Sequence, residues 1–204
     1  MFVLKTKKQQ EIVELIQNKK VFIFICEGCN EIDLDREEII KFINSLPTKN
    51  IVEAKIVDYI CNPEYVKKYF EIFDTTINLS NIILVFSCGV GVQTINKISK
   101  LPVYTGCDTF HITGYKGVTT VADENYDCNL CGSCYLNYTA NICPLTSCPK
   151  ELLNGPCGGE KNGKCEINKT KDCSWKKIFE KFKNYNKVGK IKNEILIRKF
   201  LTRL

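Results

Sequence analysis

The chain has 204 residues, of which 44% are hydrophobic and 25% charged, a composition typical of a soluble globular protein. Its longest apolar run, Val21 to Cys26, is far shorter than the roughly 20 residues that span a membrane, and the first ten residues do not resemble a secretory signal. We therefore expect a cytoplasmic protein without membrane spans, in which a disulfide framework is unfavourable.

The net charge of +6 is unevenly distributed along the chain. From Lys176 to the C-terminus there are ten Lys and Arg residues and two Glu, so this tail carries +8 and the rest about −2. The aromatic residues of the tail lie on its apolar side rather than among its charges. This pattern favours a basic amphipathic helix that contacts protein, and it argues against nucleic-acid binding.

Hydrophobic periodicity predicts alternating helices and strands in the N-terminal half of the chain. Asp35 and Glu38 form a capping box for one helix, and Pro63 opens another. The strand–helix repeat predicts an α/β fold with a parallel sheet flanked by helices. Strands are expected at 21–25, 51–57, 81–86 and 102–105, and helices at 10–17, 35–46, from 63 onward, and at 92–98.

Several cysteines follow the ends of these predicted strands. The carboxyl ends of parallel strands form the edge of the sheet where ligands bind. Single buried cysteines are common in protein cores, but a group at one edge favours a shared metal or cluster site. We expect the ligands of this site to be Cys26, Cys29, Cys61 and Cys88, with Cys107 as a substitute.

The turn from Cys88 to Gln93 is rich in glycine, but it is not a nucleotide-binding motif. It lacks the third glycine of the dinucleotide fingerprint and the Gly-Lys-Ser/Thr of a phosphate loop. His111 is the only histidine, and we expect it to be structural or exposed. Nothing in the sequence resembles a Ser/His/Asp triad or a pair of catalytic carboxylates, so the chain is not expected to be catalytic alone.

Eight of the 13 cysteines lie between Cys128 and Cys173, in a segment rich in Gly, Pro and Asn. This segment has too little apolar surface to fold by burial alone, so it must be crosslinked. The spacing of Cys128, Cys131 and Cys134 is typical of a [4Fe–4S] cluster, whose fourth ligand is more distant and often precedes a proline. Both Cys143 and Cys148 precede a proline, and the spacing does not decide between them.

The other cysteines of this segment predict a second centre there, which would bring the chain to two or three [4Fe–4S] clusters. Zinc is the alternative at this centre and would need nearly all-thiolate ligation. The expected organisation is an α/β domain at 1–120, a cysteine-rich metal-binding domain at 121–175 and a basic amphipathic tail at 176–204. The ligands of the second centre are drawn from Cys143, Cys148, Cys157, Cys165 and Cys173.

The C-terminal motifs resemble a known family. They are CPKELLNGPCGG at 148–159, NGKCE at 162–166 and CSW at 173–175, and SCGVGVQT at 87–94 with PVY at 102–104 adds to them. Together they resemble the small metal-binding subunit, also found as a fused C-terminal domain, of methylenetetrahydrofolate reductases in acetogenic and related anaerobic bacteria.

The resemblance implies an accessory role in one-carbon reduction. In that family a flavin-containing (β/α)8 subunit reduces methylenetetrahydrofolate, and the small subunit carries iron–sulfur clusters, with zinc also reported, and passes electrons to the flavin. A (β/α)8 barrel needs about 250 residues, so we expect this chain to be the electron-transfer partner of such a subunit, with further redox subunits as candidate partners. Two alternatives stay open: a zinc-stabilised assembly module without redox activity, and a methyl- or corrinoid-transfer component.

Overall fold

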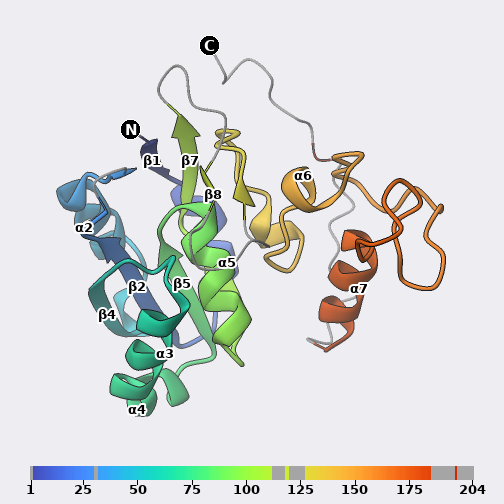
Figure 1. Cartoon of the computed structure of the whole chain (residues 1–204). Coiled ribbons are helices and arrows are strands. Elements are labelled where there is room, and N and C mark those ends of the chain that lie inside the picture. Colours follow the sequence, from blue (N-terminus) through green and yellow to red (C-terminus); the bar gives the residue numbers. More distant parts are fainter. Residues whose placement is uncertain (1, 30–31, 112–117, 120–126, 185–195, 197–204) are drawn as a thin grey trace.

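The computed structural model describes residues 2–29, 32–111, 118–119, 127–184 and 196 (Figure 1). Its centre is a parallel four-stranded sheet with the strand order β4-β2-β5-β6. The predicted parallel sheet flanked by helices is therefore confirmed. The strands are β2 (Val21–Glu27), β4 (Ile51–Asp58), β5 (Ile82–Phe86) and β6 (Val103–Thr105).

Helices cover both faces of this sheet, which explains the uninterrupted apolar run of β2. Side chains of a strand alternate between its two faces. Ile23 and Ile25 pack with α1 (Gln9–Ile16) and α2 (Arg36–Asn44), whereas Phe22 and Phe24 pack on the opposite face. The helices on that opposite face are α3 (Pro63–Ile72), α4 (Asp74–Asn78) and α5 (Gly89–Ile98).

The helix starts follow the predicted capping signals, with one exception. Asp35 Oδ1 accepts a hydrogen bond from the Glu38 amide at 3.0 Å, as expected for the N-cap of α2. Helix α5, in contrast, begins at Gly89, three residues before the predicted start. Glycine is a poor helix former, but here the first turn is buried against the cysteine-rich segment, so packing overrides the local preference.

A second, smaller sheet was not predicted. It has the order β3-β1-β7 and is formed by β1 (Phe2–Thr6), β3 (Ile32–Asp33) and β7 (Cys107–His111). Strands β1 and β7 are antiparallel, and Thr6 pairs with Cys107. This pairing connects the N-terminal strand to the segment that follows β6. Short strands that pair over such a distance along the chain carry too few residues to show a clear hydrophobic periodicity in the sequence.

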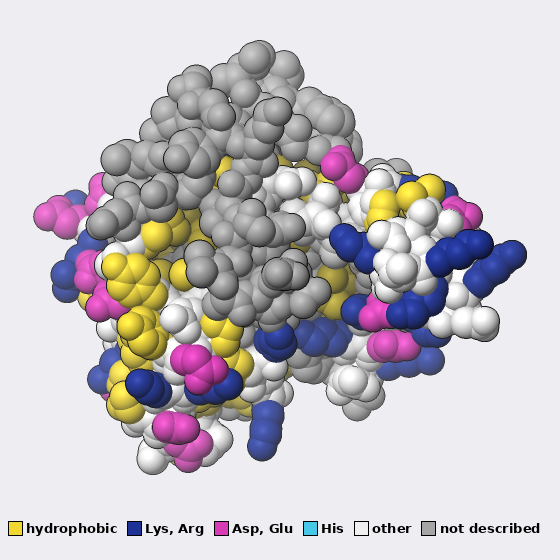
Figure 2. Space-filling view, in the orientation of Figure 1, with side chains coloured by type: hydrophobic (Ala, Val, Ile, Leu, Met, Phe, Trp, Pro, Cys, Tyr) yellow, Lys and Arg dark blue, Asp and Glu magenta, His cyan; other side chains and the backbone are white. Residues whose placement is uncertain are grey.

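The cysteine-rich segment contains mostly turns and short elements before α7 (Ser174–Asn184). Trp175, Ile178 and Phe182 of α7 are buried in one cluster with Ala140, which confirms the predicted amphipathic helix. Figure 2 shows Lys and Arg side chains gathered on the side of the molecule that carries α7. The shorter elements are η1 (Thr48–Asn50), β8 (Val118–Thr119), β9 (Asp127–Cys128), η2 (Leu136–Tyr138) and α6 (Pro144–Ser147).

Most of the connector expected at 114–127 and the second amphipathic stretch expected at 191–204 lie outside the described residues. The division into domains at 1–120, 121–175 and 176–204 stays a prediction. Within the described ranges, no helix combines the length and apolar character needed to cross a membrane.

Candidate metal centres

The strand order of the parallel sheet has a topological switch point between β2 and β5. From β2 the chain adds β4 on one side and then crosses back to add β5 and β6 on the other. The strand order therefore reverses between β2 and β5, and such reversal points are where open parallel sheets bind ligands. Cys26 lies near the end of β2, and Cys88 follows β5 directly as the N-cap of α5.

Four cysteines lie at or soon after the carboxyl ends of β2, β4 and β5, and we call them the sheet-edge set: Cys26, Cys29, Cys61 and Cys88. Burial, together with the charge of Cys88, raises the pKa of Cys26 to about 12 and that of Cys61 to about 11. Burial also raises the pKa of Cys88, and the charge of Cys29 adds to this shift.

Backbone amides partly offset these pKa increases. Those of Val90 and Gly91, in the first turn of α5, act on the pKa of Cys88, and that of Ile60 acts on the pKa of Cys26. An amide near a sulfur lowers the pKa of the thiol because it favours the thiolate. Amides that donate to sulfur are typical of the surroundings of iron–sulfur clusters.

A second group lines a cavity between the sheet and the cysteine-rich segment, and we call it the inner set: Cys128, Cys131, Cys134 and Cys143. Burial raises the pKa of Cys128, Cys131 and Cys134, and the charge of Cys143 adds to each shift. The structure thus brings Cys143, and not Cys148, to the C-x2-C-x2-C run. Gly89 and Gln93 of α5 line the same cavity.

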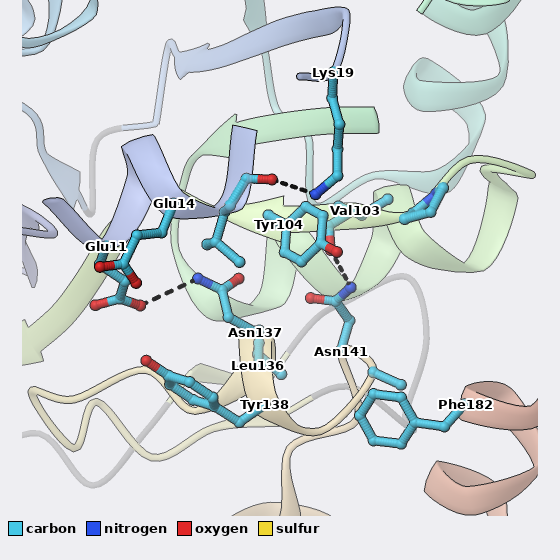
Figure 3. Close-up of a pocket in the computed structure, with 13 residues that line it drawn as sticks. Glu11, Glu14, Lys19, Val103, Tyr104, Leu136, Asn137, Tyr138, Asn141 and Phe182 are labelled. Atoms are coloured by element: carbon cyan, nitrogen blue, oxygen red, sulfur yellow. Dashed lines mark hydrogen bonds between the residues drawn. The ribbon is translucent and has the colours of Figure 1, made fainter. Parts of the chain in front are cut away.

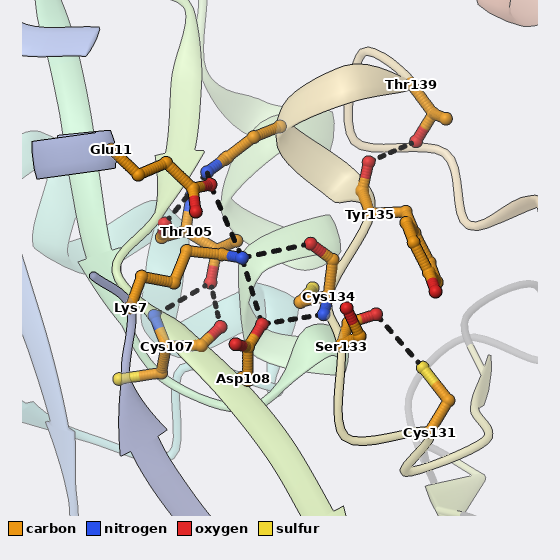
Figure 4. A network of polar contacts seen from close by, with 11 residues as sticks. Lys7, Glu11, Thr105, Cys107, Asp108, Cys131, Ser133, Cys134, Tyr135 and Thr139 are labelled. Carbon is orange, nitrogen blue, oxygen red and sulfur yellow. Dashed lines mark hydrogen bonds and ion pairs between the residues drawn. The ribbon is translucent and has the colours of Figure 1, made fainter. Parts of the chain in front are cut away.

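A buried ion pair holds the inner set against the second sheet (Figure 4). The side chain of Lys7 is 5% exposed, and its Nζ lies 2.9 Å from Asp108 Oδ1 and donates to the Cys134 carbonyl at 3.2 Å. Asp108 Oδ1 also accepts a hydrogen bond from the Cys134 amide at 2.7 Å. Burial alone would lower the pKa of Lys7, but the charges of Asp108, Cys134 and Glu11 outweigh it and raise the pKa.

The sequence gives no sign of this ion pair, because its partners lie about 100 positions apart along the chain and are joined by the unpredicted sheet. The only local hint is that Asp108 directly follows a cysteine.

A third group lines a separate cavity in the irregular segment before α7, and we call it the C-terminal set: Cys148, Cys157, Cys165 and Cys173. Trp175 lines this cavity too, and its Nε1 donates to the Leu152 carbonyl at 2.9 Å. Isolated backbone bonds order the loop, among them Cys173 N to Gly163 O at 2.7 Å and Cys165 N to Lys171 O at 3.0 Å.

Cys107 is not brought to the sheet-edge set. It is fully buried in β7, and burial, followed by the charges of Asp108 and Cys134, raises the pKa of its thiol. After Gly106 the chain leaves the parallel sheet and enters the second sheet with Cys107. Its use as a substitute ligand stays a prediction. His111 is the last residue of β7, and its side chain lies outside the described part.

A larger cavity, of about 300 Å³, lies apart from the three sets (Figure 3). Glu11, Glu14, Tyr104, Asn141 and Phe182 are among the described residues that line it, and these include no cysteine. Asn141 Nδ2 donates to the Val103 carbonyl at 2.6 Å, so this region connects the cysteine-rich segment to β6.

Whether the three cysteine sets could bind a metal ion or a cluster depends on the chemistry of their side chains. Among the residues that the structure describes, no three His, Cys, Asp or Glu side chains converge on a point that could hold a metal ion. Each set nevertheless supplies four thiols, the number that binds a [4Fe–4S] cluster or an all-thiolate zinc ion. The sheet-edge and inner sets add burial and nearby amides.

Comparison with known proteins relates the C-terminal half of the chain to one family. Residues 104–200, just under half of the chain, match the family model described as methylene-tetrahydrofolate reductase C terminal. No curated protein and no solved structure matches. The matched region contains the inner and C-terminal sets, whereas the sheet-edge set precedes it. The chain therefore carries a region similar to the C-terminal part of methylenetetrahydrofolate reductases.

Proposed function

We propose that this chain is an iron–sulfur electron-transfer subunit that delivers electrons to a flavin-containing (β/α)8 methylenetetrahydrofolate reductase subunit. The observation that carries the proposal is the grouping of the cysteines. Twelve of the 13 fall into three sets of four, and two of these sets lie in the region that matches the reductase family.

The residues of each set have a defined task in this proposal. The thiolates would bind the clusters, and [4Fe–4S] clusters supply one-electron redox chemistry when bound. The amides of Ile60, Val90 and Gly91 would stabilise negative charge on sulfur at the sheet edge, and those of Leu130 and Leu136 would do so in the inner set. At Cys26 and Cys88, which are both buried, the surroundings would keep water from the sulfurs.

A second candidate, zinc, is favoured by one observation at the C-terminal set. These four cysteines lie in a loop with only isolated bridges, such as Lys161 with Lys164. Structural zinc commonly orders segments of this kind, and binding then supplies the folding free energy. The proposal therefore includes two iron–sulfur centres, in the sheet-edge and inner sets, and a third centre that holds either iron or zinc.

The test is metal analysis of anaerobically purified protein, combined with EPR spectroscopy after reduction by dithionite. We expect reducible iron and a loss of about four iron atoms per chain in Cys131→Ala. Reduced protein should also transfer electrons to the flavin of the (β/α)8 subunit. Zinc as the only metal would refute the electron-transfer proposal and favour the assembly module. Bound corrinoid, visible by its absorption, would favour the methyl-transfer alternative.

A further inference from the structure

Ser87, between β5 and Cys88, has a buried hydroxyl that the fold itself does not use. The residue is 1% exposed, and its Oγ has no hydrogen-bond partner of suitable geometry among the described residues. Buried hydroxyls are almost always paired in native proteins, because an unpaired one destabilises the fold. The position of Ser87 therefore calls for a partner that the polypeptide does not supply.

The nearest candidate partners are the sulfurs of the sheet-edge set. Ile25 of β2 pairs with Phe86 of β5, so Cys26 and Ser87, the next residues along these parallel strands, lie beside each other on one face. Ser87 also directly precedes Cys88. A neutral thiol is a weak acceptor, whereas a negatively charged sulfur is a strong one. The hydroxyl is thus placed for a negatively charged sulfur at the sheet edge.

The neighbouring glycine keeps room for this hydroxyl. A Cβ atom at Gly91 would collide with Ser87 Oγ. Gly91 lies in the first turn of α5, whose N-cap is Cys88. The glycine spacing in residues 87–91, which does not fit a nucleotide-binding loop, is explained by packing around these sulfurs.

We propose that the Ser87 hydroxyl donates a hydrogen bond to a sulfur of the centre held by the sheet-edge set and thereby raises its reduction potential. The inference rests on the proposed function, because it requires a redox centre at this set. Reduction adds one electron to the centre, and no covalent bond forms or breaks. The added negative charge strengthens the hydrogen bond, which favours the reduced state. Ser87 is therefore a positioning residue and not a ligand.

The experiment is an EPR-monitored redox titration of Ser87→Ala in the Cys131→Ala/Cys148→Ala background, where the inner and C-terminal centres are removed and the sheet-edge signal is isolated. We expect the equilibrium constant for reduction by a mediator to fall about tenfold, which corresponds to about 59 mV for a one-electron couple, at unchanged iron content. Ser80→Ala is the matched control. Ser80 is also buried, but its Oγ donates to the Thr76 carbonyl, so the potential should not change.

Three results would contradict the inference. An unchanged potential in Ser87→Ala would show that the hydroxyl does not interact with the centre. Loss of the iron in this variant would show that Ser87 is needed for binding rather than for tuning. An equal shift in Ser80→Ala would point to a general packing effect. Wild-type protein without reducible iron would instead refute the proposed function itself.

Discussion

Cys143 and Cys148 provide a direct test of how the cysteines are grouped. Both precede a proline and both fit the fourth position of the C-x2-C-x2-C run, but the structure places them on different cavities. Cys143 lines the same cavity as Cys131 and Cys134, whereas Cys148 lines the cavity that Trp175 also lines. The two alanine variants therefore form a matched pair with different expected partners.

The expected loss of metal in each variant follows from the number of centres that its substitutions remove. Cys131→Ala and Cys143→Ala should each remove the same cluster, about four iron atoms per chain. The double variant Cys131→Ala/Cys143→Ala should then lose no more than either single variant. In contrast, Cys131→Ala/Cys148→Ala should lose two centres: about eight iron atoms, or about four iron atoms and one zinc ion.

The assay is iron, zinc and sulfide analysis of anaerobically purified variants, normalised to protein. Cys107→Ala is the control, because Cys107 lies in β7 away from the sheet-edge set, and its metal content should equal that of the wild type. The reasoning fails if Cys148→Ala, and not Cys143→Ala, proves non-additive with Cys131→Ala. It also fails if Cys131→Ala, Cys143→Ala and Cys148→Ala all lose the same metal, because a single centre would then use these three cysteines.

Three further predictions concern stability and are checked by urea unfolding of the metal-loaded protein. Lys7→Met leaves the Asp108 carboxylate without its cationic partner at a mostly buried site and should cost about 3 kcal/mol; a loss below about 1 kcal/mol would show that water replaces the lysine. Gly106→Ala places a Cβ about 2.7 Å from the Phe86 ring and should cost about 1–3 kcal/mol, and unchanged stability would mean that the ring moves freely. Asp35→Ala removes the N-cap of α2 and should cost about 1 kcal/mol, whereas no loss would mean that water caps the helix equally well.

The parallel sheet could be predicted because its signals are local. The apolar run of β2 and the cap at Asp35 each depend on a few adjacent residues, and the alternation of strands and helices then determines which strand ends share an edge. This is why the sequence predicts that Cys26, Cys61 and Cys88 lie at the same edge of the sheet.

The remaining features could not be predicted because they depend on the path of the chain in space. Strands β1 and β7 are short and pair across about 100 residues, so neither carries a strong periodic pattern. The ion pair of Lys7 with Asp108 depends on that same pairing. Cysteine spacing alone likewise does not determine connectivity, and the choice of Cys143 over Cys148 depends on the loop that leads into α6.

The two buried sets are neighbours, and the contact between them passes through Gly89. A Cβ at this position would lie 3.2 Å from Cys128 Sγ, and the charge of Cys88 raises the pKa of Cys128 beyond the effect of burial. Gly89 therefore allows a sulfur of the inner set to approach the α5 N-terminus that holds Cys88. Centres in these two sets would interact electrostatically, so that reduction of one makes reduction of the other less favourable. The α/β sheet is thus part of the proposed electron path, although it lies mostly outside the region that matches the reductase family.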